Sequence, residues 1–502
     1  MTTAAAATSA MTGNINEIFK FFRISLIWMA IIFGAVWLAS YAVGELIPHL
    51  ILLGGKDNQT LQNIADVFRK LTPLIAVMVF IPINATYMVL AERRGLALFT
   101  VRKGPNRVGP DGFLQTGADA VKLLFKENID PEGSDLIMFT LAPIIFFAPS
   151  VFGAIPLLAA VTSNHDLFQI VNLPTGIFYV LAMSSIPVVG IVMGGWASNN
   201  KYSLVGGLRS AAQAISYEIP LVLAVITICL LVGTLNVVDL AWLQNPVELA
   251  QLTDPEAADF KKWDALRGGS NATGSLLANG IGPSVLGNFG MLNWNFFGGD
   301  TITSYLALVA SGAPGYTGFS AFLKGICCIL LMISTMLLCG LYLTGACAEI
   351  NRIPFDLPEA ESELVSGYNT EYSGIRFAIF FLAEFTNLFI VSTIAVVMWF
   401  GGGSAPLPAM IYAPIMQGLD AVCAGVNGVL NGIGLPPILN AVTLSGAIWS
   451  IAKVYFLVYF AILVRGTLPR FRIDQLMDFG WKRLIPLSLI LLLAVTFLKE
   501  LI

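Results

Sequence analysis

The chain has 502 residues, of which 56% are hydrophobic and only 12% are charged, and its formal net charge is −4. Soluble globular proteins carry about 25% charged residues, so this composition excludes that class and indicates a polytopic membrane protein. The two histidines and six cysteines form no C-x-x-C pair and no Cys/His cluster, and no glycine-rich nucleotide loop is present. We therefore expect no metal, iron–sulfur cluster or nucleotide bound by this chain itself.

Apolar runs along the chain predict an all-α polytopic membrane protein with about nine transmembrane helices. A hydrocarbon core of ~30 Å needs about 20 apolar residues per helix. The runs that approach this length are 24–53, 72–92, 137–160, 175–195, 219–235, 319–348, 376–400, 441–465 and 484–500. The first is too long for the apolar part of a secretory signal and lacks a small-residue cleavage site soon after it, so we interpret it as a retained helix. Lysine and arginine concentrate in alternate connections, which predicts a cytoplasmic N-terminus and a C-terminus on the outer side.

A basic segment follows the second run, where that helix leaves the membrane. A Gly/Pro-rich turn comes next, and then a short stretch with an apolar face and a polar face, which predicts a helix lying along the membrane surface. We expect Asp111 to cap it. The basic residues are Arg93, Arg94, Arg102, Lys103 and Arg107; the apolar face comprises Phe113, Gly117, Val121 and Leu124, and the polar face Asp111, Gln115, Asp119, Lys122 and Lys126.

Two long outer connections divide the chain into six regions. Both are expected to be surface or partner-contact segments rather than parts of a reaction site. No internal repeat is visible, which argues against an inverted-repeat transporter. The regions are 1–71 (N-terminal extra helix and outer loop), 72–235 (first half of the core, with the basic elbow and the amphipathic helix), 236–318 (outer insertion), 319–400 (core helices with an acidic inner loop), 401–440 (Gly/Pro-rich outer insertion) and 441–502 (last two core helices).

Four ionisable residues lie within the predicted helices: Glu218, Glu349, Glu384 and Lys453. Each such group costs about 2.5–3.5 kcal/mol on membrane-insertion scales, so each needs a reason. Glu218 and Glu349 lie near the ends of their runs, where a side chain can reach water. Glu384 and Lys453 lie deeper, Glu384 about 12 Å along its helix from Arg376. These two are either a structural ion pair or groups that exchange protons, and a series of such groups from the inner surface to the membrane centre forms a proton path.

The inner loop that follows the sixth run is unusually acidic. Asp356 and Glu359 fit a capping box. Capping leaves Glu361 and Glu363 unexplained, and Glu359 repels Glu363 at i,i+4. Together with Arg352, this loop indicates a site where protonation or binding of a positively charged partner occurs.

Four long segments, in order, resemble a single known family. They are ERRGLALFTVRKGPNRVGPDGFLQTGADAVKLLFKE, GGWASNNKYSLVGGLRSAAQAISYEIPL, AEINRIPFDLPEAESELVSGYNTEYSG and LPRFRIDQLMDFGWKRLIPLSL. These stretches are similar to the hallmark segments of the H subunit of bacterial NADH-quinone oxidoreductase, which is subunit 1 of mitochondrial respiratory complex I. The resemblance covers roughly 72–235 and 319–502. Since the family core has eight helices, the run at 24–53 looks like an N-terminal addition, and the outer segments 236–318 and 401–440 look longer than usual.

The resemblance implies a membrane subunit of a proton-pumping NADH:quinone oxidoreductase in the bacterial cell inner membrane. Such a subunit binds no cofactor itself and forms the chamber in which ubiquinone or menaquinone is reduced, while NADH, FMN and iron–sulfur clusters belong to partner subunits. Implied partners are the peripheral-arm quinone-site and iron–sulfur subunits, the small and antiporter-like membrane subunits, and the lipid bilayer, with no nucleic acid. Carried onto this chain, the quinone-chamber residues are Arg93, Arg102, Asp119, Arg352, Asp356, Glu359, Glu361 and Glu363, and the proton-path residues are Glu218, Glu349 and Glu384; Lys453 matches a lysine common in the family's seventh helix.

Three alternatives remain open at this point. A membrane subunit of an energy-converting hydrogenase keeps the buried carboxylates, but the stretches RKGPNRVGP and PFDLPE favour the quinone enzyme. A stand-alone transporter with a midplane site at Glu384 and Lys453 is a second alternative. A purely structural membrane anchor is the third, and it would not need the buried charges.

Overall fold

The computed structural model describes residues 59–100, 102–162, 173–244, 294–310, 318–358, 365–432 and 441–502, together with residue 291 and parts of 27–51. Within these ranges the chain forms helices and turns and no β-strand, which confirms the predicted all-α class. The elements are α3 (Gln59–Phe99), η2 (Pro110–Gly112), α4 (Gln115–Phe125), α5 (Leu136–Thr162), α7 (Gly176–Ser185), α8 (Pro187–Ala197), α9 (Lys201–Val232), α10 (Val237–Trp242), η4 (Asn295–Phe297), α15 (Gly299–Ala310), α16 (Gly318–Glu349), η5 (Gly367–Asn369), α18 (Gly374–Trp399), α19 (Ala409–Gly432), α20 (Ala441–Thr467), α21 (Ile473–Phe479), η6 (Gly480–Leu484) and α22 (Ile485–Leu501).

Eight described helices are long and apolar enough to cross a membrane, and they correspond to the eight predicted runs from 72–92 onward. They are Thr60–Phe99, Leu136–Leu157, Gly176–Ala197, Lys201–Val232, Gly318–Glu349, Gly374–Trp399, Leu444–Thr467 and Ile473–Leu501. The run predicted at 24–53 lies largely outside the described residues. Of its described part, Ile32 belongs to the hydrophobic core, and Trp28 stacks on Phe113 with ring centroids 3.8 Å apart. The chain is therefore a multi-pass membrane protein.

Two local expectations differ from the structure. The outer loop expected before residue 72 is shorter, because α3 already begins at Gln59 and continues through Pro73. The expected cap at Asp111 is wrong, since Asp111 lies within the preceding 3-10 turn η2 and the N-cap position of α4 is Leu114. Where the sequence pattern suggested one amphipathic segment from 111 onward, the chain makes a turn first and begins the helix four residues later.

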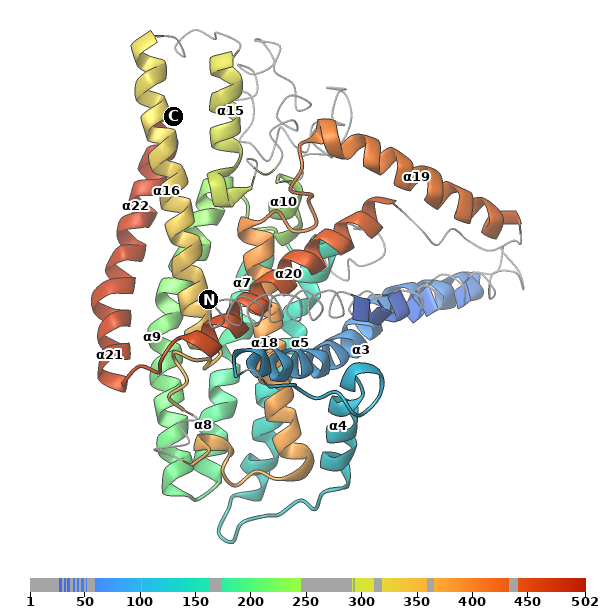
Figure 1. The fold of residues 1–502 in the computed structure, drawn as a ribbon, viewed down its shortest axis with the longest axis vertical. Helices are drawn as coiled ribbons and strands as arrows, with labels where there is room; N and C mark the ends of the chain where they lie inside the picture. The colour runs from blue at the N-terminus through green and yellow to red at the C-terminus, as the bar shows by residue number, and fades with distance from the viewer. Residues whose placement is uncertain are drawn as a thin grey trace, which may run out of the picture.

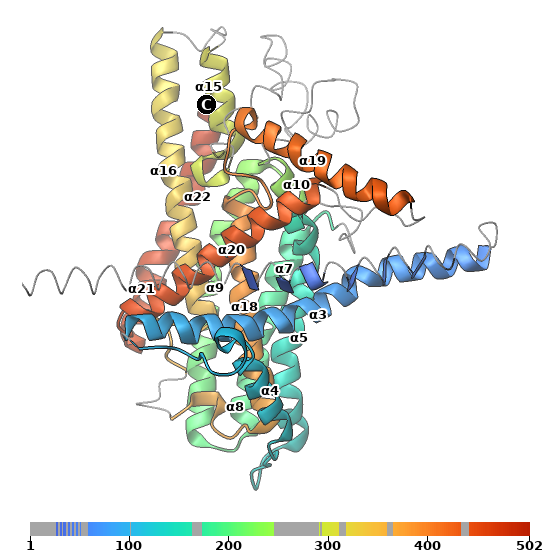
Figure 2. The same ribbon diagram turned by 45° about the vertical axis from the view of Figure 1, so that its right-hand side comes forward.

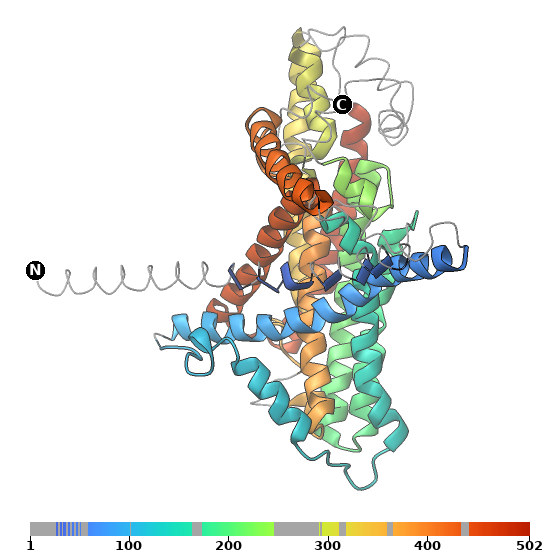
Figure 3. The same ribbon diagram turned by 90° about the vertical axis from the view of Figure 1, so that its right-hand side faces the viewer.

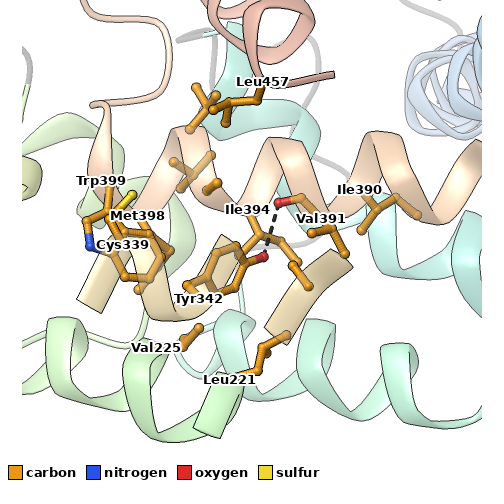
Figure 4. Packing of buried hydrophobic residues seen from close by; sticks show 14 of the residues in the cluster. Leu221, Val225, Cys339, Tyr342, Ile390, Val391, Ile394, Met398, Trp399 and Leu457 are labelled. Carbon is orange, nitrogen blue, oxygen red and sulfur yellow. Dashed lines mark hydrogen bonds between the residues drawn. The ribbon is translucent and has the colours of Figure 1, made fainter. Parts of the chain in front are cut away.

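The long helices form a bundle that α3 crosses at a steep angle (Figures 1 and 2). α5 packs against α8 and α18, and α9 packs against α8, α16 and α22. The centre between α9, α16 and α18 is apolar, and its buried Tyr342 hydroxyl donates a hydrogen bond to the Val391 carbonyl oxygen at 3.0 Å (Figure 4). Burial of such side chains stabilises the bundle by roughly 25 cal/mol per Å² of apolar surface.

The two ends of the bundle carry different elements. α10, α15, α19 and the C-terminus lie at one end, whereas α4, η5 and the turn between α8 and α9 lie at the other (Figures 1 and 3). α19 is a helix within the Gly/Pro-rich segment 401–440, and α10 and α15 belong to the segment 236–318. The described helices of both segments therefore lie at the same end as the C-terminus (Figure 1).

The C-terminal end of α18 and the turn that follows it are held by side chains from three other parts of the chain. The Lys453 ammonium on α20 donates hydrogen bonds to the carbonyl oxygens of Phe400, Gly402 and Ser404 at 2.6, 3.0 and 2.5 Å. Amide groups of Gln244 and Asn295 donate to the carbonyls of Val397 and Met398 at 3.0 and 2.8 Å. The last carbonyls of a helix have no partner within the helix, so these contacts satisfy groups that would otherwise be buried unpaired.

Candidate functional site

A buried carboxylate, Glu92, lies near the C-terminal end of α3 and is only 8% exposed. One of its oxygens accepts a hydrogen bond from the Arg352 guanidinium at 2.8 Å, and the other accepts one from Arg465. Glu92 was not among the site residues predicted from the sequence. One feature of the sequence could have indicated that Glu92 is buried. It follows Met88 by four residues and Ala85 by seven, and positions at these spacings share one face of a helix, here the buried one.

Charged residues gather around a cavity of about 180 Å³ beside Glu92. It lies between α3, α18, α20 and the loop that follows α16, and a buried water needs only about 10–15 Å³ of such volume, so several waters fit. The cavity is lined by Val89, Glu92, Arg93, Asn351, Arg352, Asp356, Phe381, Glu384, Phe385 and Arg465. Arg93, Arg352, Asp356 and Glu384 were predicted as site residues from three segments, and the structure brings them to this one cavity.

Asp356 joins the same cluster through an ion pair with Arg470, at 3.1 Å. Burial raises the pKa of Asp356 above its ordinary value, while the charges of Arg470, Arg465 and Arg352 act in the opposite direction. Its other oxygen is buried and has no hydrogen-bond partner among the described residues. An unpaired buried carboxylate oxygen beside a cavity indicates a hydration site.

Glu384 lies on α18, is 8% exposed, and accepts a hydrogen bond from the Tyr368 hydroxyl at 2.8 Å. Phe385, the next residue, places its ring 4.3 Å from the Arg352 guanidinium carbon. A cation over an aromatic face is stabilised without a counter-ion, so Arg352 is held between a carboxylate and a ring. Arg352 and Glu384 therefore border the same cavity.

A second, smaller cavity of about 30 Å³ lies beside Glu349. Its polar lining includes Ser150, Ser184, Ser210 and Asn387. Ser184 and Glu349 face the same cavity, and Glu218 is near enough for its charge to act on the Glu349 carboxylate. Two predicted proton-path residues are thus neighbours, and the space beside Glu349 holds about two waters at roughly 10–15 Å³ each.

Lys453 lies apart from both cavities. Its ammonium is held by three carbonyls at the end of α18 and by the face of Trp294, 4.2 Å away. Phe400 is sixteen residues beyond Glu384, which is about 24 Å along a helix. The alternative of an ion pair between Glu384 and Lys453 is therefore wrong, because Lys453 compensates the negative end of α18 instead.

The remaining chamber residues lie at the edge of the site or beyond it. Arg93 pairs with Asp119 of α4 at 2.5 Å, and both side chains are partly exposed. Arg102 lies on the exposed elbow. Glu359, Glu361 and Glu363 fall outside the described residues, so the capping box expected for Asp356 and Glu359 stays a prediction. Across the described parts of the chain, no group of three or more His, Cys, Asp or Glu side chains could hold a metal ion.

Comparison with known proteins places the chain in one family. Residues 72–256 and 308–496 match the family described as NADH dehydrogenase. The H subunit of NADH-quinone oxidoreductase from Brevibacillus brevis is 36% identical over 412 residues, which are 82% of this chain and 88% of the relative. The H subunits from Bacillus mycoides and from Bacillus cereus strain B4264 are each 36% identical over 429 residues, or 85% of this chain and 92% of each relative. The chain belongs to the family of NADH-quinone oxidoreductase H subunits.

Membership of this family confirms the resemblance read from the four sequence segments. The residues that line both cavities lie within the matched ranges. Residues 257–307, between those ranges, coincide with most of the predicted outer insertion, and residues before 72 coincide with the predicted N-terminal addition.

Proposed function

We propose that this chain is the membrane-embedded H subunit of a proton-pumping NADH:quinone oxidoreductase, and that it forms the quinone chamber with partner subunits. The observation that carries the proposal is the buried charge cluster around the larger cavity. The carboxylates of Glu92, Asp356 and Glu384 and the guanidinium groups of Arg352 and Arg465 line it, and Arg470 pairs with Asp356 from the exposed side. A membrane anchor has no use for such a cluster, because each buried charge costs several kcal/mol before pairing.

The cluster suits a reaction in which charge appears and disappears nearby. Reducing a quinone to the quinol consumes two electrons and two protons, and the electrons come from an iron–sulfur cluster on a partner subunit. Negative charge on the bound quinone attracts the guanidinium groups that Glu92 holds. In a low-dielectric interior such a charge acts over several ångströms, so the proton affinities of Glu384 and Asp356 change with the state of the quinone.

The carboxylates then supply a route for protons. Glu384 and Asp356 border the larger cavity, Glu349 borders the smaller one, and the charge of Glu218 acts on Glu349. When the quinol departs, protons leave Glu384 and Asp356 and pass to Glu349 and Glu218. From there they pass to the antiporter-like subunits. Arg93, Arg102, Asp119 and the acidic loop with Glu359, Glu361 and Glu363 complete the chamber against the peripheral arm.

The proposed setting is the one that the resemblance implies. The complex lies in the bacterial cell inner membrane, with the N-terminus of this chain in the cytoplasm. NADH, FMN and the iron–sulfur clusters are bound by partner subunits, and the quinone is the substrate. Because α4 carries Lys122 at the border of an exposed apolar face formed by Leu124 and Phe125, we assign that face to the membrane interface.

The variant Glu384→Gln tests the function in the intact complex. The amide keeps an oxygen for the Tyr368 hydroxyl, so the complex should assemble and should oxidise NADH with ferricyanide, an acceptor that bypasses the quinone. Reduction of a short-chain quinone and proton uptake into vesicles should both be abolished. The control is Glu132→Gln, which changes an exposed carboxylate outside the cluster. Normal quinone reduction by Glu384→Gln, or purification of the chain without iron–sulfur proteins, would contradict the proposal.

A further inference from the structure

The N-terminal run, 24–53, packs on the bundle through one face. Its described residues are helical, and of these Ile32 and Ser40 are buried at 7% and 5% exposure, whereas Ile27 and Ile31 are each 51% exposed. Residues separated by four or eight positions lie near one face of a helix, so the face with Ile32 and Ser40 contacts the protein and the other faces outward. The described part of the run lies beside α3 (Figure 3).

Two contacts place this run antiparallel to α3. A Cβ on Gly44 would lie 2.8 Å from the Thr72 hydroxyl oxygen, so the two segments approach closely in the first half of α3. Sixteen residues earlier, Trp28 stacks on Phe113, and the Phe113 ring is 6.3 Å from that of Tyr87. Tyr87 follows Thr72 by fifteen residues, so both intervals are about 22–24 Å of helix at 1.5 Å per residue. Trp28 therefore lies level with Tyr87.

Phe113 belongs to the short segment that also carries Asp119, at the edge of the larger cavity. Asp119 accepts hydrogen bonds from the Arg93 guanidinium at 2.5 Å and from the Gln115 amide at 3.3 Å, and Arg93 lines the cavity. The Arg93 and Asp119 side chains are 44% and 34% exposed, so water screens this pair and the pair alone holds α4 weakly.

The start of α4 is held by the stack of Trp28 on Phe113. Of the eleven residues of α4, Thr116 alone is buried, and Val121 and Phe125 are 52% and 87% exposed. Phe113, just ahead of the helix, is half-buried against the core, and its ring plane lies only 10° from that of the Trp28 indole. Aromatic pairs stabilise beyond the apolar area that they bury, so this stack fixes α4 where the ion pair is weak.

We propose that Trp28 is a positioning residue for quinone binding. By stacking on Phe113 it holds α4, so that Asp119 keeps the Arg93 guanidinium at the edge of the cavity. The inference rests on the proposed function, because it gives the N-terminal run a role towards the quinone chamber named there. The family match begins at residue 72, so this support is an addition of the chain to the matched core.

Packing alone leads to a different expectation. Were Trp28 only an anchor for the N-terminal run, Trp28→Ala would lower the amount of assembled complex, and the complex that assembles would bind quinone normally. Positioning predicts a higher KM for quinone in the assembled complex, because Arg93 loses its fixed place at the cavity edge. The kcat should be unchanged, which is the pattern expected when a contact supports the bound substrate and the transition state equally.

The test measures KM and kcat for a short-chain quinone in the intact complex. Trp28→Ala should raise KM about fivefold, which equals about 1 kcal/mol and is the size of an aromatic stacking contribution. Trp28→Phe keeps a ring and should restore most of the wild-type KM. Ile27→Ala is the matched control, because Ile27 is the neighbouring apolar residue and is 51% exposed, and it should match the wild type. All these variants should keep NADH:ferricyanide activity.

A double-mutant cycle connects the change in KM to the stack itself. Phe113→Ala should raise KM at least as much as Trp28→Ala, and the double variant should match Phe113→Ala, because both substitutions remove the same contact. Additive changes in KM would overturn the proposal. If Trp28→Ala does not assemble, Trp28→Leu decides, because leucine keeps an apolar side chain there and lacks the ring.

The outcomes separate this inference from the proposed function. A wild-type KM in Trp28→Ala, with Glu384→Gln inactive, would overturn the role of Trp28 and leave the proposed function standing. Full activity of Glu384→Gln would overturn the proposed function itself.

Discussion

Removal of the charge on Glu92 should loosen the loop that carries Arg352. In Glu92→Gln, two guanidinium groups lose the carboxylate between them, although the amide oxygen can still accept one hydrogen bond. Breaking a buried ion pair by removing one partner costs about 3–5 kcal/mol. Arg352 carries most of this cost, because its side chain is 8% exposed, whereas that of Arg465 is 28% exposed and partly screened by water. The lower figure, ~3 kcal/mol, corresponds to roughly a 150-fold change in a local opening equilibrium.

Hydrogen–deuterium exchange of the purified complex measures that equilibrium. The backbone N–H of Arg352 donates to the Cys347 carbonyl in the last turn of α16 at 3.1 Å, and that of Phe355 donates to the Arg352 carbonyl at 2.8 Å; both should exchange roughly 150-fold faster in Glu92→Gln. The control is Asp478→Asn, which breaks a highly exposed pair with Lys482 and should change exchange by no more than about twofold. Equal exchange in the two variants would refute the view that Glu92 holds the loop.

Three further variants test separate parts of the structure. Lys453→Met leaves the carbonyls of Phe400, Gly402 and Ser404 without their donor, so the melting temperature of the complex should fall by the equivalent of about 3 kcal/mol. Lys453→Arg should lie between this variant and the wild type. An unchanged melting temperature in Lys453→Met would show that Lys453 does not stabilise this turn. Gly206→Ala would place a Cβ 2.9 Å from the backbone of Gly367, so native gels should show less assembled complex, whereas Gly117→Ala, which has open space, should assemble normally. Because burial raises the pKa of Asp356, the folded chain binds that proton more tightly, and the resulting stability is present at low pH and lost as the pH rises through the folded-state pKa. Asp356→Asn should therefore raise the melting temperature by an amount that grows with pH, and a shift that is equal at all pH values would contradict this.

The membrane-spanning helices could be predicted from sequence because the bilayer imposes a length and a composition. Every described span from α3 to α22 coincides with an apolar run of the expected length. Helix ends were less predictable. α3 begins at Gln59, within a stretch that also contains Asp66 and Lys70, because a helix can continue into water after its apolar part ends.

The charged site was predicted in part, since a lone charge in an apolar run is conspicuous but its partner is not. Glu384 stood out for this reason. Glu92 did not, because it directly precedes Arg93 and Arg94 and reads as the start of the water-exposed elbow. Its actual partners are 260 and 373 residues away along the chain, and no local pattern encodes such a pairing.

The contacts among Ser210, Gln213 and Asn351 were also missed, for a related reason. Serine, glutamine and asparagine near helix ends are common and usually contact water or local backbone. Gln213 is instead buried against the turn after α16, and only the packing of α9 beside α16 makes this visible. The same holds for Lys453, whose partners are backbone carbonyls and therefore leave no trace in the sequence.

The contact between Gln244 and the residues after 293 has a consequence for protein engineering. The side-chain oxygen of Gln244 accepts a hydrogen bond from the backbone N–H of Asn295 at 3.0 Å, so the chain leaves the bundle and rejoins it at nearly the same point. Doubling or halving the number of residues in between changes the loop-closure cost by only about 0.6 kcal/mol. An epitope or fluorescent domain placed there should therefore report on assembly in living cells while the helices, and the chemistry at the far end of the bundle, continue undisturbed.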